Sequence, residues 1–326
     1  MKKESSNFFR LSAQPWGLLT VAGVLACAAT LFGFLGRFSW LLDLFSHFRI
    51  QYLISLSILG TLLLTTRRRK TAAIFLGFAC PNLLLVLPLY FGGRNTLPQG
   101  VLVRRAMLLN VNTRLGDAER VKRAIRDADP DILVLEEISS QWMADLKCLT
   151  KSHPYHFTQP REDNFGIGLF SKFPLVESEV AYIGSAGVPS ILATVNTGQT
   201  NLRVIATHPL PPKGRDYSRW RNEQLDQLPD YAQSPLPLIL LGDLNVTPWN
   251  HHFRRLLSRT GLTDSSKGHG VQPTWPNYNP LLLIPIDHCL HSPGIVIVDK
   301  EIGADVASDH YPVIVDFAIV NEPGLK

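Results

Sequence analysis

The sequence is poor in cysteine, with four in 326 residues. None of the four belongs to a Cys/His group with the spacing of a zinc site. Cys148 and Cys289 lie far apart in the sequence; we expect free, buried thiols, although an oxidising compartment would permit a bridge between them. The chain also lacks a glycine-rich phosphate loop, an internal repeat and a low-complexity tract. It therefore has the signature of neither a P-loop protein nor a repeat protein.

Acidic residues are scarce in the first 93 positions, where only Glu4 and Asp43 accompany nine basic residues. The remaining part, residues 94–326, holds 23 basic and 25 acidic residues, a formal charge of −2. The formal charge of +5 for the whole chain is therefore carried by the amino-terminal segment. A nuclease that grips duplex DNA usually needs a basic face, and the near-neutral remainder does not indicate one.

The amino-terminal segment, residues 1–93, is dominated by apolar runs. A transmembrane helix needs about 20 apolar residues, which the first and third runs provide. The middle run has only 17 uninterrupted residues after a lead-in at 39–49 that carries charges and that we expect at the membrane interface. A single amphipathic helix on the membrane surface is the alternative for this middle part. We predict three transmembrane helices, at about residues 16–36, 48–66 and 71–91.

Basic residues flank these predicted spans unevenly. Lys2, Lys3 and Arg10 precede the first span, and a second cluster at 67–70 separates the second from the third. Because basic loops stay in the cytoplasm, the part after the third span is expected outside it. A cleaved signal peptide fits less well, since the first apolar run is longer than usual and two more follow closely.

Residues 94–100 form a short, turn-rich linker, and from 101 to 320 strand-like apolar runs alternate with amphipathic helices. Many β segments with helices between them suit one α/β domain with two packed sheets and helices outside. Strands are expected at 101–111, 131–135, 166–171, 190–195, 202–208, 236–244, 286–290, 294–299 and 312–317. Helices are expected at 117–128, 139–150, 218–233 and 251–261.

Polar side chains capable of chemistry stand at the ends of five strands. Each alone is most simply a turn former, a helix cap or a structural histidine, but strand ends on one side of a sheet converge on one place. Asp-x-Asn puts a carboxylate and an amide side by side. Asp followed by His can orient and activate a water, which indicates a hydrolase. The residues are Asn110, Glu137, His208, Asp243 with Asn245, and Asp309 with His310.

The order and spacing of LNV, LEE, ATH, GDLN and SDH resemble the endonuclease/exonuclease/phosphatase superfamily, the DNase I-like metal-dependent phosphoesterases. The resemblance covers about residues 101–320. It implies a four-layer α/β sandwich, two mixed β-sheets flanked by helices. The amino-terminal segment looks like that of bacterial membrane-anchored members of unassigned substrate. With the orientation expected from the basic residues, this likeness predicts an integral protein of the cytoplasmic (inner) membrane with its catalytic domain outside the cytoplasm.

The resemblance also implies a divalent cation, Mg²⁺ with Mn²⁺ as a substitute. Glu137 matches the metal-binding glutamate, and Asn110 and Asp309 complete the implied metal site. Asn112 is a second candidate for the asparagine role. Glu136 stands where the family often has Gln; we expect it to point away from the site because adjacent strand side chains face opposite sides, and a place in the metal shell is the alternative.

The resemblance also implies a separate role for each of the catalytic residues. Asp243 orients or deprotonates the attacking water, while His208 and Asn245 contact the phosphate oxygens and the transition state. His310, next to Asp309, faces the scissile phosphate and is oriented by Asp287.

Two further positions are candidates for substrate contacts. Asn164 precedes a strand that matches the family. Arg215 belongs to a basic run that could hold a phosphate or a lipid headgroup; the alternative is a solvated helix start. The run comprises Lys213, Arg215, Arg219 and Arg221.

The sequence thus predicts a membrane-anchored, metal-dependent phosphoesterase that hydrolyses a phosphodiester or phosphomonoester with activated water. Its substrate would be a phosphate ester, either lipid-linked or a nucleic acid, so a metal-dependent endonuclease or exonuclease is the first alternative. A catalytically inactive, membrane-tethered binding module is the second. It is disfavoured because an inactive member typically loses several of the catalytic residues, and all are present.

Overall fold

The computed structural model describes residues 15–92, 97 and 100–320. Most of the predicted linker at 94–100, and the basic residues that precede the first helix, lie outside these ranges. The chain divides into two compact units, Met1–Val86 and Leu87–Lys326. The boundary after Val86 lies ahead of the predicted linker, because the Leu89 carbonyl already accepts hydrogen bonds from Gly268 and Gly270 of the second unit.

The first unit is helical and contains two helices long and apolar enough to cross a membrane, Trp16–Phe34 and Arg69–Tyr90. The prediction of three transmembrane spans is not supported, because the middle helix has only 16 residues. The helices are α1 (Pro15–Phe34), η1 (Gly36–Phe38), α2 (Trp40–Leu44), α3 (Arg49–Leu64) and α4 (Arg69–Val86), and η2 (Leu87–Tyr90) follows.

A polar contact inside this first unit holds the start of the middle helix. The Arg49 guanidinium is buried and donates to the Thr30 carbonyl at 2.8 Å and to Asn82 Oδ1 at 3.3 Å. Asn82 in turn donates to Thr30 Oγ1 at 3.0 Å. The charge expected at the membrane interface is therefore enclosed between helices, where hydrogen bonds compensate its burial.

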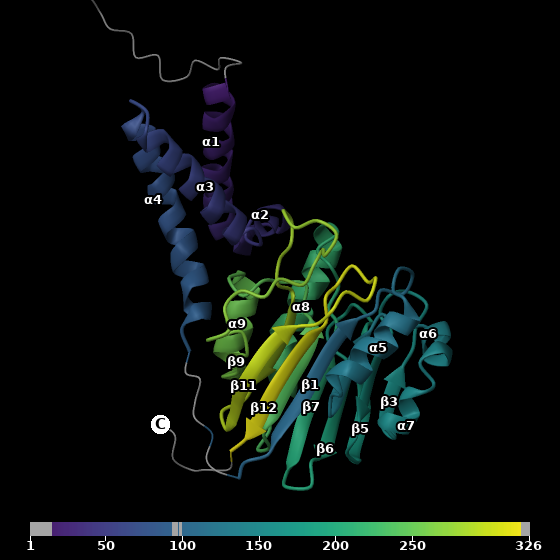
Figure 1. The fold of residues 1–326 in the computed structure, drawn as a ribbon. Coiled ribbons are helices and arrows are strands. Elements are labelled where there is room, and N and C mark those ends of the chain that lie inside the picture. The colour runs from purple at the N-terminus through teal and green to yellow at the C-terminus, as the bar shows by residue number, and fades with distance from the viewer. Residues whose placement is uncertain (1–14, 93–96, 98–99, 321–326) are drawn as a thin grey trace, which may run out of the picture. The chain divides into compact units, whose positions relative to one another are not determined.

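The second unit contains two six-stranded sheets, each mixed in direction (Figure 1). In the first sheet, β1 runs parallel to β2 and the other neighbours are antiparallel. Its strands, in spatial order, are β11 (Ile295–Ile302), β12 (Val313–Ile319), β1 (Val103–Asn110), β2 (Ile132–Glu136), β4 (Ile167–Ser171) and β3 (Tyr155–Gln159).

In the second sheet, β7 runs parallel to β8 and the other neighbours are antiparallel. Its strands, in spatial order, are β5 (Leu175–Tyr182), β6 (Pro189–Asn196), β7 (Asn201–Thr207), β8 (Leu238–Asp243), β10 (Asp287–His291) and β9 (Thr263–Asp264).

The alternation of side chains along β1 shows how the layers form. Ala106 and Leu108 join the core between the sheets, whereas Met107 and Leu109 join the core beneath the outer helices. A third core packs the remaining helices on the second sheet. Helices α5 (Ala118–Ala128), α6 (Ser140–Asp145) and α7 (Leu149–Ser152) cover the first sheet, and α8 (Arg215–Tyr231) and α9 (His251–Thr260) cover the second.

This arrangement confirms the predicted α/β fold of two mixed sheets with helices outside. The short strand β3, whose five residues are not fully buried, was not expected from its sequence. Cys148 and Cys289 are free as predicted, but Cys148 is exposed and only Cys289 is buried.

The register of neighbouring strands brings the predicted site residues together. Asn110 pairs with Glu136 across β1 and β2, and Asp287 pairs with Asp243 across β10 and β8. Gly242 permits the close approach that this edge needs, because a Cβ there would lie 1.9 Å from the Thr207 carbonyl oxygen. The carboxyl ends of β1, β2, β7 and β8 therefore converge.

Candidate active site

A pocket of about 740 Å³ lies beyond these strand ends. It collects side chains that are dispersed over more than 170 positions of the sequence. The chemically capable residues of its wall include Asn112, Glu137, His208, Asp243, Asn245, Asp309 and His310.

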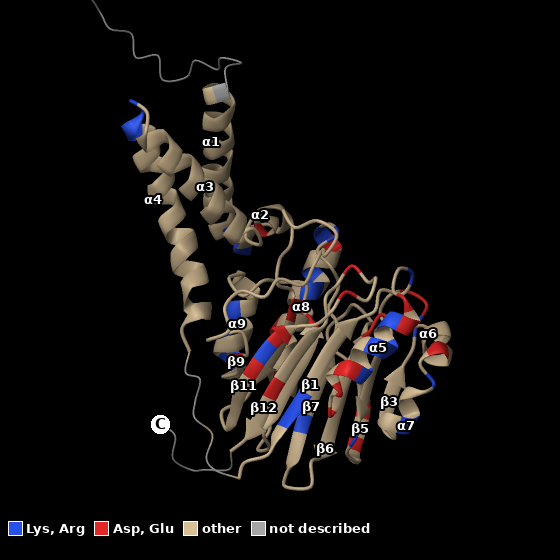
Figure 2. Ribbon diagram, viewed as in Figure 1, with Lys and Arg blue, Asp and Glu red and all other residues tan. Residues whose placement is uncertain are grey.

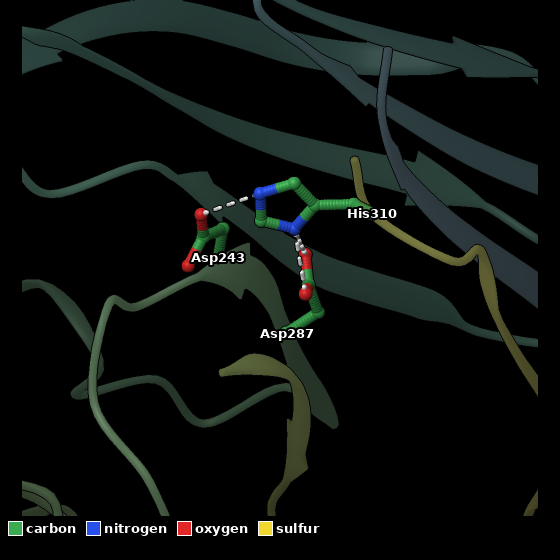
Figure 3. Close-up of side chains that lie close together, drawn as sticks. All are labelled: Asp243, Asp287 and His310. Atoms are coloured by element: carbon green, nitrogen blue, oxygen red, sulfur yellow. Dashed lines mark hydrogen bonds and ion pairs between the residues drawn. The ribbon is translucent and has the colours of Figure 1, made fainter. Parts of the chain in front are cut away.

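At the base of the pocket, Asp287, His310 and Asp243 form a line in which His310 is hydrogen-bonded to Asp287 and within ion-pair distance of Asp243 (Figure 3). His310 Nδ1 lies 2.9 Å from Asp287 Oδ2, and its Nε2 lies 3.7 Å from Asp243 Oδ2. Asp287 does not line the pocket, whereas His310 and Asp243 do. Asp287 therefore fixes the ring from behind and leaves Nε2 facing the pocket.

Burial and charge act in opposite directions on this pair. Burial disfavours an imidazolium, but the adjacent carboxylate of Asp287 outweighs it and raises the pKa of His310 to about 10. For Asp287, burial would raise the pKa, but the charge and hydrogen bond of His310 hold it below its usual value. The arrangement is thus an ion pair, and His310 is a donor at neutral pH.

His208 approaches Asp243 from another strand end. Its Nε2 lies 3.5 Å from Asp243 Oδ2, and its ring lies against Phe165 at 5.4 Å. Burial opposes its charge, but Glu136 and Asp243 outweigh that effect and raise the pKa of His208 to about 9. Its Nδ1 is buried and has no hydrogen-bond partner among the residues that the structure describes.

Glu136 is fully buried behind the pocket. Both of its carboxylate oxygens face the backbone N–H of Asp243, at 3.1 and 3.3 Å. Burial raises the pKa of Glu136 to about 8. Its side chain does point away from the pocket cavity, and it supports the strand end that carries Asp243.

Glu137 lies just beyond β2 with a left-handed backbone, φ 60°. Its carboxylate lines the pocket and accepts from Asn110 Nδ2 at 3.0 Å, Asn164 Nδ2 at 2.7 Å and the Thr113 N–H at 3.3 Å. Such a backbone is costly for a glutamate and persists only where its surroundings impose it. Here three donors do so, and they aim the carboxylate into the pocket.

Asp309 supplies the second carboxylate of this wall. Its Oδ1 accepts from Asn112 Nδ2 at 2.7 Å, and its Oδ2 accepts from Trp275 Nε1 at 2.8 Å. Both carboxylates are therefore oriented by neutral donors and remain open to the pocket. We call Glu137, Asp309 and Asn112 the acidic wall.

Two groups in this site could attract a divalent cation. Asp243, Asp287 and His310 offer ligand atoms that lie within 4.8 Å of one another. The acidic wall offers the carboxylate oxygens of Glu137 and Asp309, the donors that hard cations prefer. The donor chemistry favours the acidic wall, because both Asp287 oxygens already face His310 Nδ1.

The remaining predicted residues divide into three cases. Asn245 lines the pocket, and its Nδ2 donates to the Pro209 carbonyl at 3.0 Å. Asn110 is buried outside the wall, where its amide holds Glu137 and the Asn112 N–H. Arg215 is exposed as the first residue of α8 and does not line the pocket. From the same basic run only Lys213 does so.

Two functional contacts had no clear signal in the sequence. Thr113 donates its hydroxyl to the Glu137 carbonyl at 2.8 Å, and Trp275 donates to Asp309. Neither follows a recognised motif. The threonine could have been found because it comes directly after the Asn-Val-Asn run that ends β1.

The sequence model of the Endonuclease/Exonuclease/phosphatase family matches residues 107–310. This match covers more than half of the chain and contains every residue of the pocket wall. The chain belongs to that family. It is a metal-dependent phosphoric ester hydrolase with a buried Asp/Asp/His cluster in its site.

Solved structures support the fold. The endonuclease/exonuclease/phosphatase from Beutenbergia cavernae DSM 12333 is 20% identical, with a TM-score of 0.55 over 67% of this chain and 72% of its own. Truncated TDP2 from Caenorhabditis elegans is 18% identical, with a TM-score of 0.55 over 66% and 97%. The human Nocturnin catalytic domain with bound sulfate is 20% identical, with a TM-score of 0.53 over 67% and 95%. No curated protein matches the chain significantly.

The buried Glu136 and His208 predict a pH-dependent stability. Both pKa values lie above those of an unfolded chain, so the native protein retains protons that the unfolded chain releases. The stabilising contribution of Glu136 is lost as the pH rises from 4.5 towards about 8, and that of His208 from 6.5 towards about 9. The free energy of unfolding should therefore fall by about 1 kcal/mol per pH unit for each proton retained.

Glu136→Gln should make this pH dependence shallower, because the amide still accepts from Asp243 but carries no titrating proton and no charge beside His208. The measurement is urea denaturation of the full chain in detergent with a chelator, from pH 6 to 9. The exposed Glu119→Gln is the matched control and should follow the wild type. An unchanged slope in Glu136→Gln would contradict the electrostatic account.

Proposed function

We propose that the protein is a membrane-anchored, Mg²⁺-dependent phosphoesterase that hydrolyses a phosphodiester or phosphomonoester with activated water. The observation that carries this proposal is the adjacency of Asp309 and His310. One belongs to the acidic wall and the other to the Asp287 ion pair, so metal-type ligands and a charged donor face the same pocket. A binding module would need neither group.

In the proposed site, Glu137 and Asp309 are the anionic metal ligands. Their fit to a hard cation rests on the two oriented carboxylates that face the pocket. When bound, Mg²⁺ offsets negative charge on the phosphoryl oxygens; Mn²⁺ accepts the same oxygen donors. Asn110 holds the Glu137 carboxylate. Of the two asparagines that the sequence offered for this role, Asn112 is the one that faces the pocket.

In the proposed site, residues on the other side of the pocket contact the attacking water and the phosphate. In this proposal Asp243 orients a water and accepts its proton through Oδ2, because the Asn245 N–H occupies Oδ1 whereas the nearest imidazole nitrogens lie 3.5 and 3.7 Å from Oδ2. His310 and His208 both favour the charged form, so they are suited to stabilise phosphate oxygens as donors. Asp287 keeps the His310 ring in this orientation.

The substrate is proposed to be a small or lipid-linked phosphate ester rather than duplex DNA. Lys and Arg are interspersed with Asp and Glu over the catalytic unit (Figure 2), and a protein that tracks duplex backbone needs a basic stripe. Nuclease activity is the second candidate, because a solved relative, TDP2 from D. rerio, is complexed with a single-strand DNA product.

For the membrane placement, we propose that the amino-terminal helices anchor the chain and leave the catalytic unit outside the cytoplasm. The support is the apolar helix Arg69–Tyr90, which precedes the catalytic unit, and the basic residues 67–70 at its start, because a basic helix end favours the cytoplasmic side. An alkaline phosphatase fused at the carboxyl terminus should then be active in a bacterial host and a fluorescent protein dark. The reverse pattern would contradict this topology.

Replacing Asp243 or His310 tests the catalytic assignment. Asp243→Ala and His310→Ala should each lower metal-dependent hydrolysis of bis(p-nitrophenyl) phosphate by about 100-fold or more, because each removes a group that acts on water or phosphate. The exposed Asp127→Ala and His156→Ala are matched controls. Circular dichroism checks that the variants fold. Activity within about tenfold of wild type in either variant would remove that residue from the catalytic set.

Replacing Glu137 tests the metal assignment. Glu137→Gln should raise the Mg²⁺ concentration for half-maximal activity by about tenfold or more, because a neutral amide replaces a strong ligand of nearly the same shape. Glu119→Gln should leave it unchanged. A normal Mg²⁺ requirement in Glu137→Gln, with full folding, would place the metal elsewhere.

A further inference from the structure

An exposed apolar loop stands beside the mouth of the pocket. Residues 276–285, here called the mouth loop, carry three large apolar side chains within five positions: Tyr278 is 72% exposed, Leu281 is 78% and Leu282 is 46%. Single exposed apolar residues are ordinary, but a group of them at one loop tip marks an interaction surface.

The mouth loop is held in place at both ends. Trp275 and Ile286 flank it and both line the pocket. Trp275 and Ile284 form an antiparallel bridge, with hydrogen bonds of 3.1 and 2.6 Å between their backbones. Asn277 N–H donates to the Asp309 carbonyl at 3.0 Å. The exposed tip is therefore fixed relative to the acidic wall rather than free to fold over the apolar core.

The tip itself is also ordered. Asn279 Oδ1 accepts from the Leu281 N–H at 3.1 Å, and the Asn279 carbonyl accepts from the Leu282 N–H at 3.0 Å. These local bonds satisfy the backbone and turn the leucine side chains outward. A rigid loop that exposes leucines in this way loses little conformational entropy when those side chains are buried by a partner.

The rest of the pocket mouth has the same mixed character. Leu115 lines the pocket and is 60% exposed. Arg114 and Lys213 line it from two other loops, and both are exposed. Apolar tips with cations around them match a phospholipid surface, where acyl chains accept the former and anionic headgroups attract the latter.

We propose that the mouth loop inserts its apolar tip into a lipid surface and presents the pocket to a phosphate ester carried by a lipid headgroup. The substrate part of this proposal rests on the phosphoesterase activity proposed above. Trp275 gives the loop a direct connection to that site, since its indole N–H holds Asp309.

The first experiment measures insertion without activity. The full chain, with Cys80→Ser and Cys148→Ser, is labelled with an NBD fluorophore at Leu281→Cys and reconstituted in phosphatidylcholine–phosphatidylglycerol vesicles. Iodide quenching should be about fivefold weaker than for the same label at Val176→Cys, an equally apolar and 54% exposed site on β5. Equal quenching at the two positions would overturn the proposal. The proposal would also be overturned if the protein were a dimer in detergent and the loop variant described below were a monomer.

The second experiment measures substrate choice. Tyr278→Ser/Leu281→Ser/Leu282→Ser is compared with Leu102→Ser/Val176→Ser, which removes exposed apolar side chains at the other end of the sheets. Phosphatidic acid and phosphatidylglycerol in vesicles, bis(p-nitrophenyl) phosphate and single-stranded DNA are the four probes. The loop variant should lose about tenfold on a vesicle lipid and stay within about twofold on the soluble diester, while the control variant keeps both activities.

The outcomes separate the two proposals. If the wild type hydrolyses none of the probes with Mg²⁺, the proposed phosphoesterase function fails. If it hydrolyses the soluble diester but neither lipid, or if the loop variant keeps full activity on lipid, the proposal for the mouth loop is overturned. Cleavage of DNA with no cleavage of lipid overturns it as well.

Discussion

The ion pair between Asp287 and His310 is the interaction on which the site depends, because it joins the two sheets. Asp287 begins β10 of the second sheet, and His310 precedes β12 of the first. A second polar contact crosses the same gap, where Glu136 of β2 accepts from the Asp243 N–H of β8. Apolar side chains fill the space between the sheets further in, so these polar links mark the edge where the sandwich opens into a pocket.

Buried charges of this kind stabilise a fold only while they remain paired. Removing one partner would leave an uncompensated charge, which costs about 3–5 kcal/mol. The same ion pair orients the His310 ring. Because Asp287 occupies Nδ1, the other nitrogen of His310 is available only to groups in the pocket. Packing of the two sheets and orientation of His310, the proposed catalytic histidine, are therefore the same structural requirement.

The sequence predicted the sheets and much of the site because both follow simple periodicities. Continuous apolar runs indicated β1 and β2, and the polar residue at each strand end indicated where the strands converge. The geometry of Glu137 could not be predicted in that way. It lies past the strand with a left-handed backbone imposed by Asn110, Asn164 and Thr113, contacts that span 27 positions or fewer but follow no period.

Two other features depend on tertiary contacts and were invisible to a count of apolar residues. The Arg49 charge, expected at the membrane interface, is enclosed within the helical unit, where it binds Thr30 and Asn82. The basic run after β7 offered Arg215 either as a substrate contact or as part of a solvated helix start; α8 begins at Arg215, which is exposed, whereas Lys213 and Tyr217 line the pocket. The residue at which a helix begins decides which neighbouring side chains reach the pocket, and sequence patterns locate helix boundaries poorly.

The central claim is that the acidic wall holds the metal while the Asp287–His310 pair serves the phosphate. Anomalous diffraction from crystals of the full chain soaked in Mn²⁺ tests it directly. The account predicts a manganese peak coordinated by the carboxylates of Glu137 and Asp309, with His310 still paired to Asp287. A peak coordinated by Asp243, Asp287 and His310, with Glu137 and Asp309 left unliganded, would contradict it.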